Sequence, residues 1–96
     1  MHVAALALDL HVPQSRSLKA KRAVVKPVVE GVRRRFNVAV AEVGYDEQWQ
    51  RARVGVAVVA ATPAHATEVL DAVERYVWGQ PELEVVSAER SWVGTA

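Results

Sequence analysis

The hydrophobic positions of the first segment alternate with a period of two residues. Apolar side chains fall on one face of residues 2–12, which holds Ala4, Leu6, Leu8 and Leu10. The side chains of the other face are smaller and become polar towards its end: Val3, Ala5, Ala7, Asp9 and His11. This alternation is typical of a β-strand, and because both faces are largely apolar we expect the strand to lie inside a sheet.

Residues 17–36 follow a helical period instead. At about 100° per residue, one narrow stripe collects Leu18, Val25, Val28, Val29, Val32 and Phe36. Ser17 is a typical N-cap residue directly before that stripe. Pro27 removes one helical hydrogen bond, but it lies opposite the stripe, so we expect one helix that bends around its core.

The pattern becomes extended again in three later segments. Residues 37–45 and 52–61 are rich in Val and Ala, and the polar segment 46–51, which contains Trp49, joins them. Two extended segments with such a connection predict a β-hairpin with a long loop. Residues 84–92 alternate once more and predict a last strand.

Residues 62–79 are predicted to form a second helix. Thr62 followed by Pro63 places an N-cap residue before a proline at the first helical position. Gly79 and then Pro81 end the helix. Its buried face is expected to hold Ala66, Val69, Leu70, Val73 and Val77.

The predicted order of elements is β-α-β-β-α-β, which is the split βαβ pattern of ferredoxin-like α+β folds. The length of 96 residues fits a single domain over residues 1–96. Right-handed crossovers place both helices on one face of a four-stranded antiparallel sheet. We expect the first and fourth strands at the centre of that sheet, and its other face to be open.

Composition narrows the classes of function. The chain has no cysteine, which excludes disulfide bonds, thiolate nucleophiles and cysteine metal sites. No apolar run approaches the roughly 20 residues of a membrane span, and no basic segment typical of a signal peptide opens the chain. We therefore expect no membrane span and no cleaved signal peptide.

Charge is strongly segregated along the chain. Residues 16–35 hold eight basic residues and one acid, although the whole chain has a net charge of only +1. A band on the predicted first helix combines Lys19, Arg22, Lys26 and Arg33, and we take these as candidate contacts to nucleic acid phosphates. Three more cations add to the field: Lys21, Arg34 and Arg35.

The basic segment does not require a nucleic acid. The helix face can simply be solvated, or it can bind an acidic protein partner. The two helices can also pair with each other, because the second helix carries Glu68, Asp71 and Glu74. All three alternatives remain compatible with the sequence.

Candidate catalytic chemistry is sparse. Asp9 and His11 share one strand face about 7 Å apart, which is compatible with an acid–base or metal-binding pair. The alternative is that a neighbouring carboxylate satisfies His11. The five glycines are scattered, and no phosphate loop or nucleophile motif is present. We expect no enzymatic activity, no metal and no cofactor.

Two surfaces are candidates for protein contact. Trp49 near Arg51 and Arg53 is a candidate for a cation–π or hot-spot anchor at an interface; alternatively, Trp49 covers one end of the core. The open sheet face is expected to be rich in Val and Ala, and a homodimer packed through it would cover that apolar surface. Base stacking on this face is not expected, because the first and third strands contain no aromatic residue.

Two segments of the chain form a specific pair of motifs: Ser17-Leu18-Lys19-Ala20-Lys21-Arg22, and Phe36-Asn37-Val38-Ala39-Val40-Ala41-Glu42-Val43 followed by Trp49-Gln50-Arg51-Ala52. In these segments the sequence resembles the YlxP-like family of small bacterial proteins of unknown function. The resemblance covers about residues 2–92 and implies a ferredoxin-like fold, with no catalytic residues to carry over. It also implies a cytoplasmic role near ribosome assembly or translation, because genes of this family often neighbour those for a translation initiation factor and a ribosome-binding factor. Pro27 departs from the helix formers that the family commonly has there.

The sequence thus favours a non-enzymatic binding module that contacts ribosomal RNA or a ribosome-associated protein through its basic helix. The alternative is a homodimeric regulatory or scaffolding domain. In that case a protein or small ligand would bind at the open sheet or at the Trp49 loop.

Overall fold

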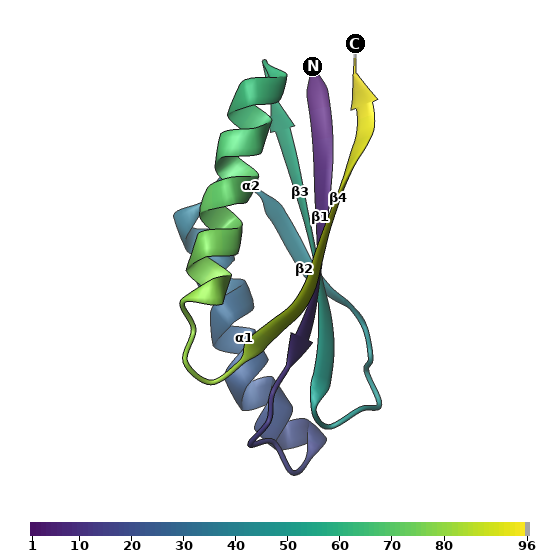
Figure 1. The fold of residues 1–96 in the computed structure, drawn as a ribbon, viewed down its shortest axis with the longest axis vertical. Helices are drawn as coiled ribbons and strands as arrows, with labels where there is room; N and C mark the ends of the chain where they lie inside the picture. The colour runs from purple at the N-terminus through teal and green to yellow at the C-terminus, as the bar shows by residue number, and fades with distance from the viewer. Residues whose placement is uncertain (96) are drawn as a thin grey trace.

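The secondary-structure elements follow the predicted order (Figure 1). The computed structural model describes residues 1–95. The strands are β1 (His2–His11), β2 (Ala39–Gly44), β3 (Arg51–Ala60) and β4 (Glu84–Thr95), and the helices are α1 (Leu18–Arg35) and α2 (Pro63–Trp78). All neighbouring strands are antiparallel, and both helices lie on one face of the sheet, so the ferredoxin-like fold is confirmed (Figure 1).

The strand order is β2-β3-β1-β4, which corrects one expectation. β1 is central as predicted, but its central neighbour is β3, and β4 lies at the edge. The reason is that each βαβ crossover joins two parallel strands that are not adjacent. β3 fills the gap between β1 and β2, and β1 fills the gap between β3 and β4, so the two units interlock.

The core lies between the helices and the large-residue face of the two central strands. The register pairs Leu6 with Val56 and Leu8 with Val54, and all four side chains are at most 4% exposed. The helices cover them with buried apolar residues that include Val25, Val29, Val32, Leu70, Val73 and Val77. Burial of each such side chain contributes roughly 1.5–3 kcal/mol, so this layer is the main source of stability.

The helix ends lie where the capping residues predict them. The Ser17 hydroxyl accepts a hydrogen bond from the amide of Ala20 at 3.0 Å, and the Thr62 hydroxyl accepts one from His65 at 3.1 Å. Pro27 is exposed, and α1 continues through it to Arg35. Among the described residues, neither helix is long and apolar enough to cross a membrane.

The two helices approach each other where Gly31 faces Tyr76. A Cβ atom added at Gly31 would overlap the hydroxyl of Tyr76 and lie 2.9 Å from its Cζ atom. The Tyr76 ring is held in place by an edge contact with Phe36 at 6.0 Å between centroids and by the Arg35 guanidinium 4.9 Å from its centroid. The absence of a side chain at Gly31 therefore allows this close approach.

Gly31→Ala is expected to destabilise the protein by about 1–3 kcal/mol, because the added methyl group displaces the packed ring. In a Tyr76→Ala background the same substitution is expected to stabilise by up to about 1 kcal/mol, since only the helix propensity of alanine remains. Urea unfolding of the native protein, the two single variants and the double variant measures both changes in the free energy of unfolding. Stabilisation by Gly31→Ala in the native background would contradict the steric account.

Candidate nucleic-acid interface

Helix α1 presents a row of uncompensated cations on the side that faces away from α2. Lys19, Arg22 and Lys26 are exposed, and within residues 1–95 their side chains form no ion pair or hydrogen bond. Arg33 continues the row towards β2. These four residues are called the basic face below.

Arg33 differs from the other members of the basic face because its guanidinium has protein partners. Nη1 donates to Glu30 Oε1 at 2.6 Å, and Nη2 donates to the carbonyl of Val40 in β2 at 2.9 Å. Half of its side chain remains exposed. Arg33 therefore joins α1 to β2 and also contributes positive charge to the basic face. The other three cations, Lys19, Arg22 and Lys26, have no side-chain partner within residues 1–95.

Lys21 does not belong to this surface, which corrects its place among the cations expected to add to the field around the nucleic-acid contacts. Its side chain is buried, with the residue only 5% exposed. The ammonium donates to the carbonyls of Tyr45 at 2.7 Å and Arg51 at 3.0 Å, which flank the β2–β3 loop. At about 100° per residue Lys21 falls within the apolar stripe of α1, so the helical period points its side chain towards the sheet.

Arg34 and Arg35 are exposed but lie outside the basic face. Arg34 Nε donates to the carbonyl of Glu30 at 3.4 Å. Arg35 lies over the Tyr76 ring, on the side of α1 that contacts α2. Both add positive charge around the helix without extending the row.

The acidic residues of α2 bind partners other than α1. Arg90 of β4 pairs with Asp71 at 2.8 Å and also with Glu74, and Glu68 lies 3.8 Å from His65. Desolvation by burial acts to lower the pKa of Arg90, but hydrogen bonds and attraction to Glu74 and Asp71 outweigh it and raise the pKa above its ordinary value. Across residues 1–95 no ion pair joins the two helices, so pairing between them does not explain the basic segment.

Asp9 and His11 lie on the same sheet face but bind in opposite directions. Asp9 pairs with Arg53 of β3 at 2.8 Å, and His11 Nδ1 lies 2.8 Å from the Glu84 carboxylate of β4. A neighbouring carboxylate thus satisfies His11, as the alternative interpretation predicted. No group of three or more His, Cys, Asp or Glu among the described residues is placed to hold a metal ion.

Trp49 is 57% exposed, so it does not cover the core. The predicted pairing with nearby cations is also absent, because Arg51 stacks on the Tyr45 ring at 5.1 Å and Arg53 binds Asp9. The indole instead borders a hollow of about 580 Å³ at the end of the sheet, whose lining includes Arg51.

Gln50, which the sequence did not single out, holds the Trp49 loop to the β1–α1 connection. Its side-chain nitrogen Nε2 donates to the carbonyls of Pro13 at 3.2 Å and Ser15 at 3.1 Å. Its backbone carbonyl accepts a hydrogen bond from the Val12 amide at 2.8 Å. Trp49 therefore lies on a loop that is fixed by hydrogen bonds from both the side chain and the backbone of Gln50. A glutamine beside an exposed tryptophan is too common a pair to indicate this in advance.

Comparisons with known proteins give a family and a fold. A family model described as "Protein of unknown function (DUF503)" matches residues 3–90. The chain is 36% identical over 76 residues to the "Uncharacterized protein YlxP" of Bacillus subtilis (strain 168), which covers 79% of this chain and 83% of that protein. It is similar to the solution NMR structure of a de novo designed protein with a ferredoxin fold, with a TM-score of 0.52 and 15% identity over 100% of this chain and 91% of the design. At that identity the likeness concerns the fold alone.

Lys21→Met is expected to lower the free energy of unfolding by about 1–3 kcal/mol, because it leaves two partly buried carbonyls without the ammonium donor. Lys26→Met removes the same charge from an exposed position and is expected to change stability by less than about 0.5 kcal/mol. Urea unfolding of both variants makes the comparison. Equal effects at the two positions would show that the Lys21 ammonium does not hold the loop.

Proposed function

The chain belongs to the DUF503 family of proteins of unknown function, and because the family description gives no activity, we propose from the surface of α1 that the protein is a non-enzymatic RNA-binding module. Its resemblance to the YlxP-like proteins is confirmed by the same comparison. In this proposal the basic face contacts phosphates of a structured RNA in the cytoplasm.

The proposal rests on the row of three cations that have no side-chain partner within residues 1–95. Lys19, Arg22 and Lys26 lie on consecutive turns of α1, and the helical rise places the first and last about 10 Å apart along the axis. Arg33 extends the row to about 21 Å. A nucleic acid strand in a helix carries one charge per about 3.4 Å of axis, so such a row lies beside several phosphates.

The sheet gives no support to readout of single bases. The central strands β1 and β3 contain no Phe, Tyr or Trp on which a base could stack, and His11 at the end of β1 lies against Glu84. Contacts made by lysine and arginine to phosphates carry little sequence information. The proposal is therefore recognition of RNA shape and backbone, and the implied neighbourhood of translation genes makes structured ribosomal RNA the first probe.

One observation favours a second candidate function, the capture of a protein partner at the Trp49 loop. Trp49 is exposed although its loop is fixed by Gln50. A rigid exposed tryptophan is the residue type that most often dominates binding energy at interfaces. Such binding would be insensitive to salt and lost in Trp49→Ala, whereas binding of RNA by the basic face falls steeply with salt.

The triple variant Lys19→Gln, Arg22→Gln, Lys26→Gln tests the RNA proposal. Each phosphate contact contributes about 0.7–0.9 to the slope of log affinity against log salt, so the slope is expected to fall in magnitude by about 2–3. Affinity at low salt is expected to fall roughly tenfold or more. Fluorescence anisotropy with a structured ribosomal RNA fragment at several salt concentrations gives both values.

The matched control changes net charge by the same amount at another place. Ala61→Glu, Ala64→Glu and Thr67→Glu add three negative charges at exposed positions around the start of α2. This control should keep most of the native salt slope, because the basic face is intact. Equal loss in both triple variants would reduce the effect to net charge and contradict a site on α1.

A further inference from the structure

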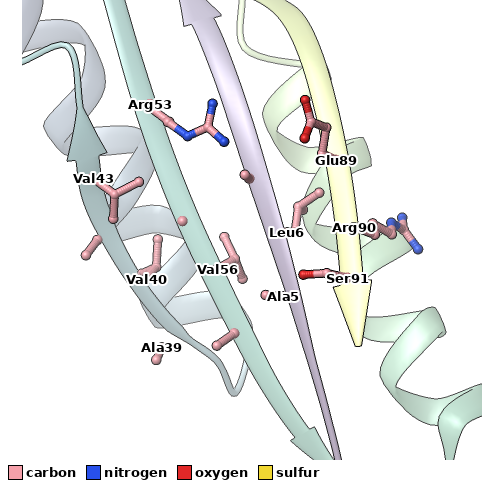
Figure 2. Close-up of a pocket in the computed structure, with 14 residues that line it drawn as sticks. Ala5, Leu6, Ala39, Val40, Val43, Arg53, Val56, Glu89, Arg90 and Ser91 are labelled. Carbon is pink, nitrogen blue, oxygen red and sulfur yellow. The ribbon is translucent and has the colours of Figure 1, made fainter. Parts of the chain in front are cut away.

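Small residues occupy the centre of the sheet face that lies opposite the helices. The strand register lines them up in two rows that cross all four strands. One row is Ala39, Ala57, Ala5 and Ser91, and the other is Ala41, Gly55, Ala7 and Glu89. Together with Val43 and Arg53 they line a shallow hollow of about 510 Å³ (Figure 2). The seven small residues of these rows are called the small-residue floor, and Glu89 ends the second row on the edge strand β4.

Larger apolar side chains stand at the margins of this floor. Val43 lies at the irregular end of β2, is 56% exposed, and has its Cγ1 atom 3.3 Å from where a Cβ of Gly55 would be. Val59 is 63% exposed and alternates with buried Val58, so it points to the open face. The face therefore combines apolar projections at its margins with an apolar hollow at its centre.

Charges on the open face are largely neutralised within the chain. Asp9 pairs with Arg53, and His11 lies against Glu84. The basic face of α1, in contrast, is of one sign and would repel a second copy of itself. Glu89 on the edge strand β4 is the charge of this face for which residues 1–95 show no ion pair. Apart from Glu89, another copy can pack on the open face without bringing like charges together.

We infer that the open face is the contact between two copies of this chain, packed sheet on sheet about a twofold axis. A twofold interface uses the same patch on both copies and must be self-complementary. The marginal valines of one copy would fill the hollow above the small-residue floor of the other. Alanine and glycine at the centre allow the sheets to approach at least as closely as the usual spacing of about 10 Å.

The area of the face is sufficient for such a dimer. The central strands have ten residues each, which corresponds to a length of about 33 Å, and four strands span about 19 Å. Each copy would then contribute roughly 600 Å², and the total of about 1,200 Å² lies at the lower end of stable interfaces. We therefore expect a dimer that dissociates on dilution.

This dimer is independent of the proposed RNA binding. Both helices lie on the face of the sheet opposite the proposed contact (Figure 1), so sheet-on-sheet packing would leave the basic face of each copy uncovered. A variant that separates the copies should keep the salt-dependent RNA contacts of each chain. Failure of one proposal therefore does not imply failure of the other.

Because the chain has no cysteine, single cysteines report directly on which face is shared. Ala57→Cys places a thiol in the small-residue floor, and Ala64→Cys places one at an exposed position of α2. A short bismaleimide is expected to convert Ala57→Cys to a covalent dimer and to leave Ala64→Cys monomeric. Cross-linking of Ala64→Cys alone would overturn the proposed face.

Light scattering after size exclusion tests the same contact without a cross-linker. At high protein concentration the native chain should have twice its mass of 10.5 kDa. Ala57→Lys should return it to the single mass, whereas the control Ala64→Lys should remain dimeric. Val59→Lys, at the exposed margin, gives a second test if Ala57→Lys unfolds, as judged by its thermal transition. A native protein of single mass, or a dimer that persists in folded Ala57→Lys and in Val59→Lys, overturns the inference.

Discussion

The rest of this structure depends on the unequal faces of its two central strands. On one face of β1 and β3, leucine and valine side chains such as Leu6, Leu8 and Val56 are almost fully buried. On the other face, Ala7 and Ala57 offer too little apolar area to hold a helix. Because layers of secondary structure pack by burying their apolar faces, both helices lie on the large-residue side, and the small-residue side stays open.

The same core decides which charges the protein presents. Three contacts fix the rotation of α1: Lys21 binds the ends of the β2–β3 loop, Arg33 binds β2, and Gly31 packs against Tyr76. With these sides of the helix committed to protein, Lys19 and its neighbours on the basic face are left towards solvent. The proposed function therefore follows from helix packing and not from net charge, which is only +1.

Local signals predicted the elements well, whereas long-range pairing limited the rest. Ser17 and Thr62 predicted both helix starts because an N-cap acts on amides within its own first turn. The prediction of the two central strands was right for β1 and wrong for β4, since the interlocking of the two crossovers has no local signal in the sequence. Lys21 was misassigned although its helical position placed it among the buried residues. The Asp9–Arg53 pair joins residues 44 positions apart and depends on a register that no single segment contains.

Amide chemical-shift mapping of the native protein, during titration with a structured ribosomal RNA fragment, shows whether the basic face of α1 binds RNA. It locates the contact without any substitution and distinguishes the basic face from the open face and from the Trp49 loop. If the basic face binds RNA, the largest shifts lie in residues 16–26 and diminish as salt is added. Shifts confined to β1 and β3 or to residues 46–50, or no shifts at low salt, would contradict it.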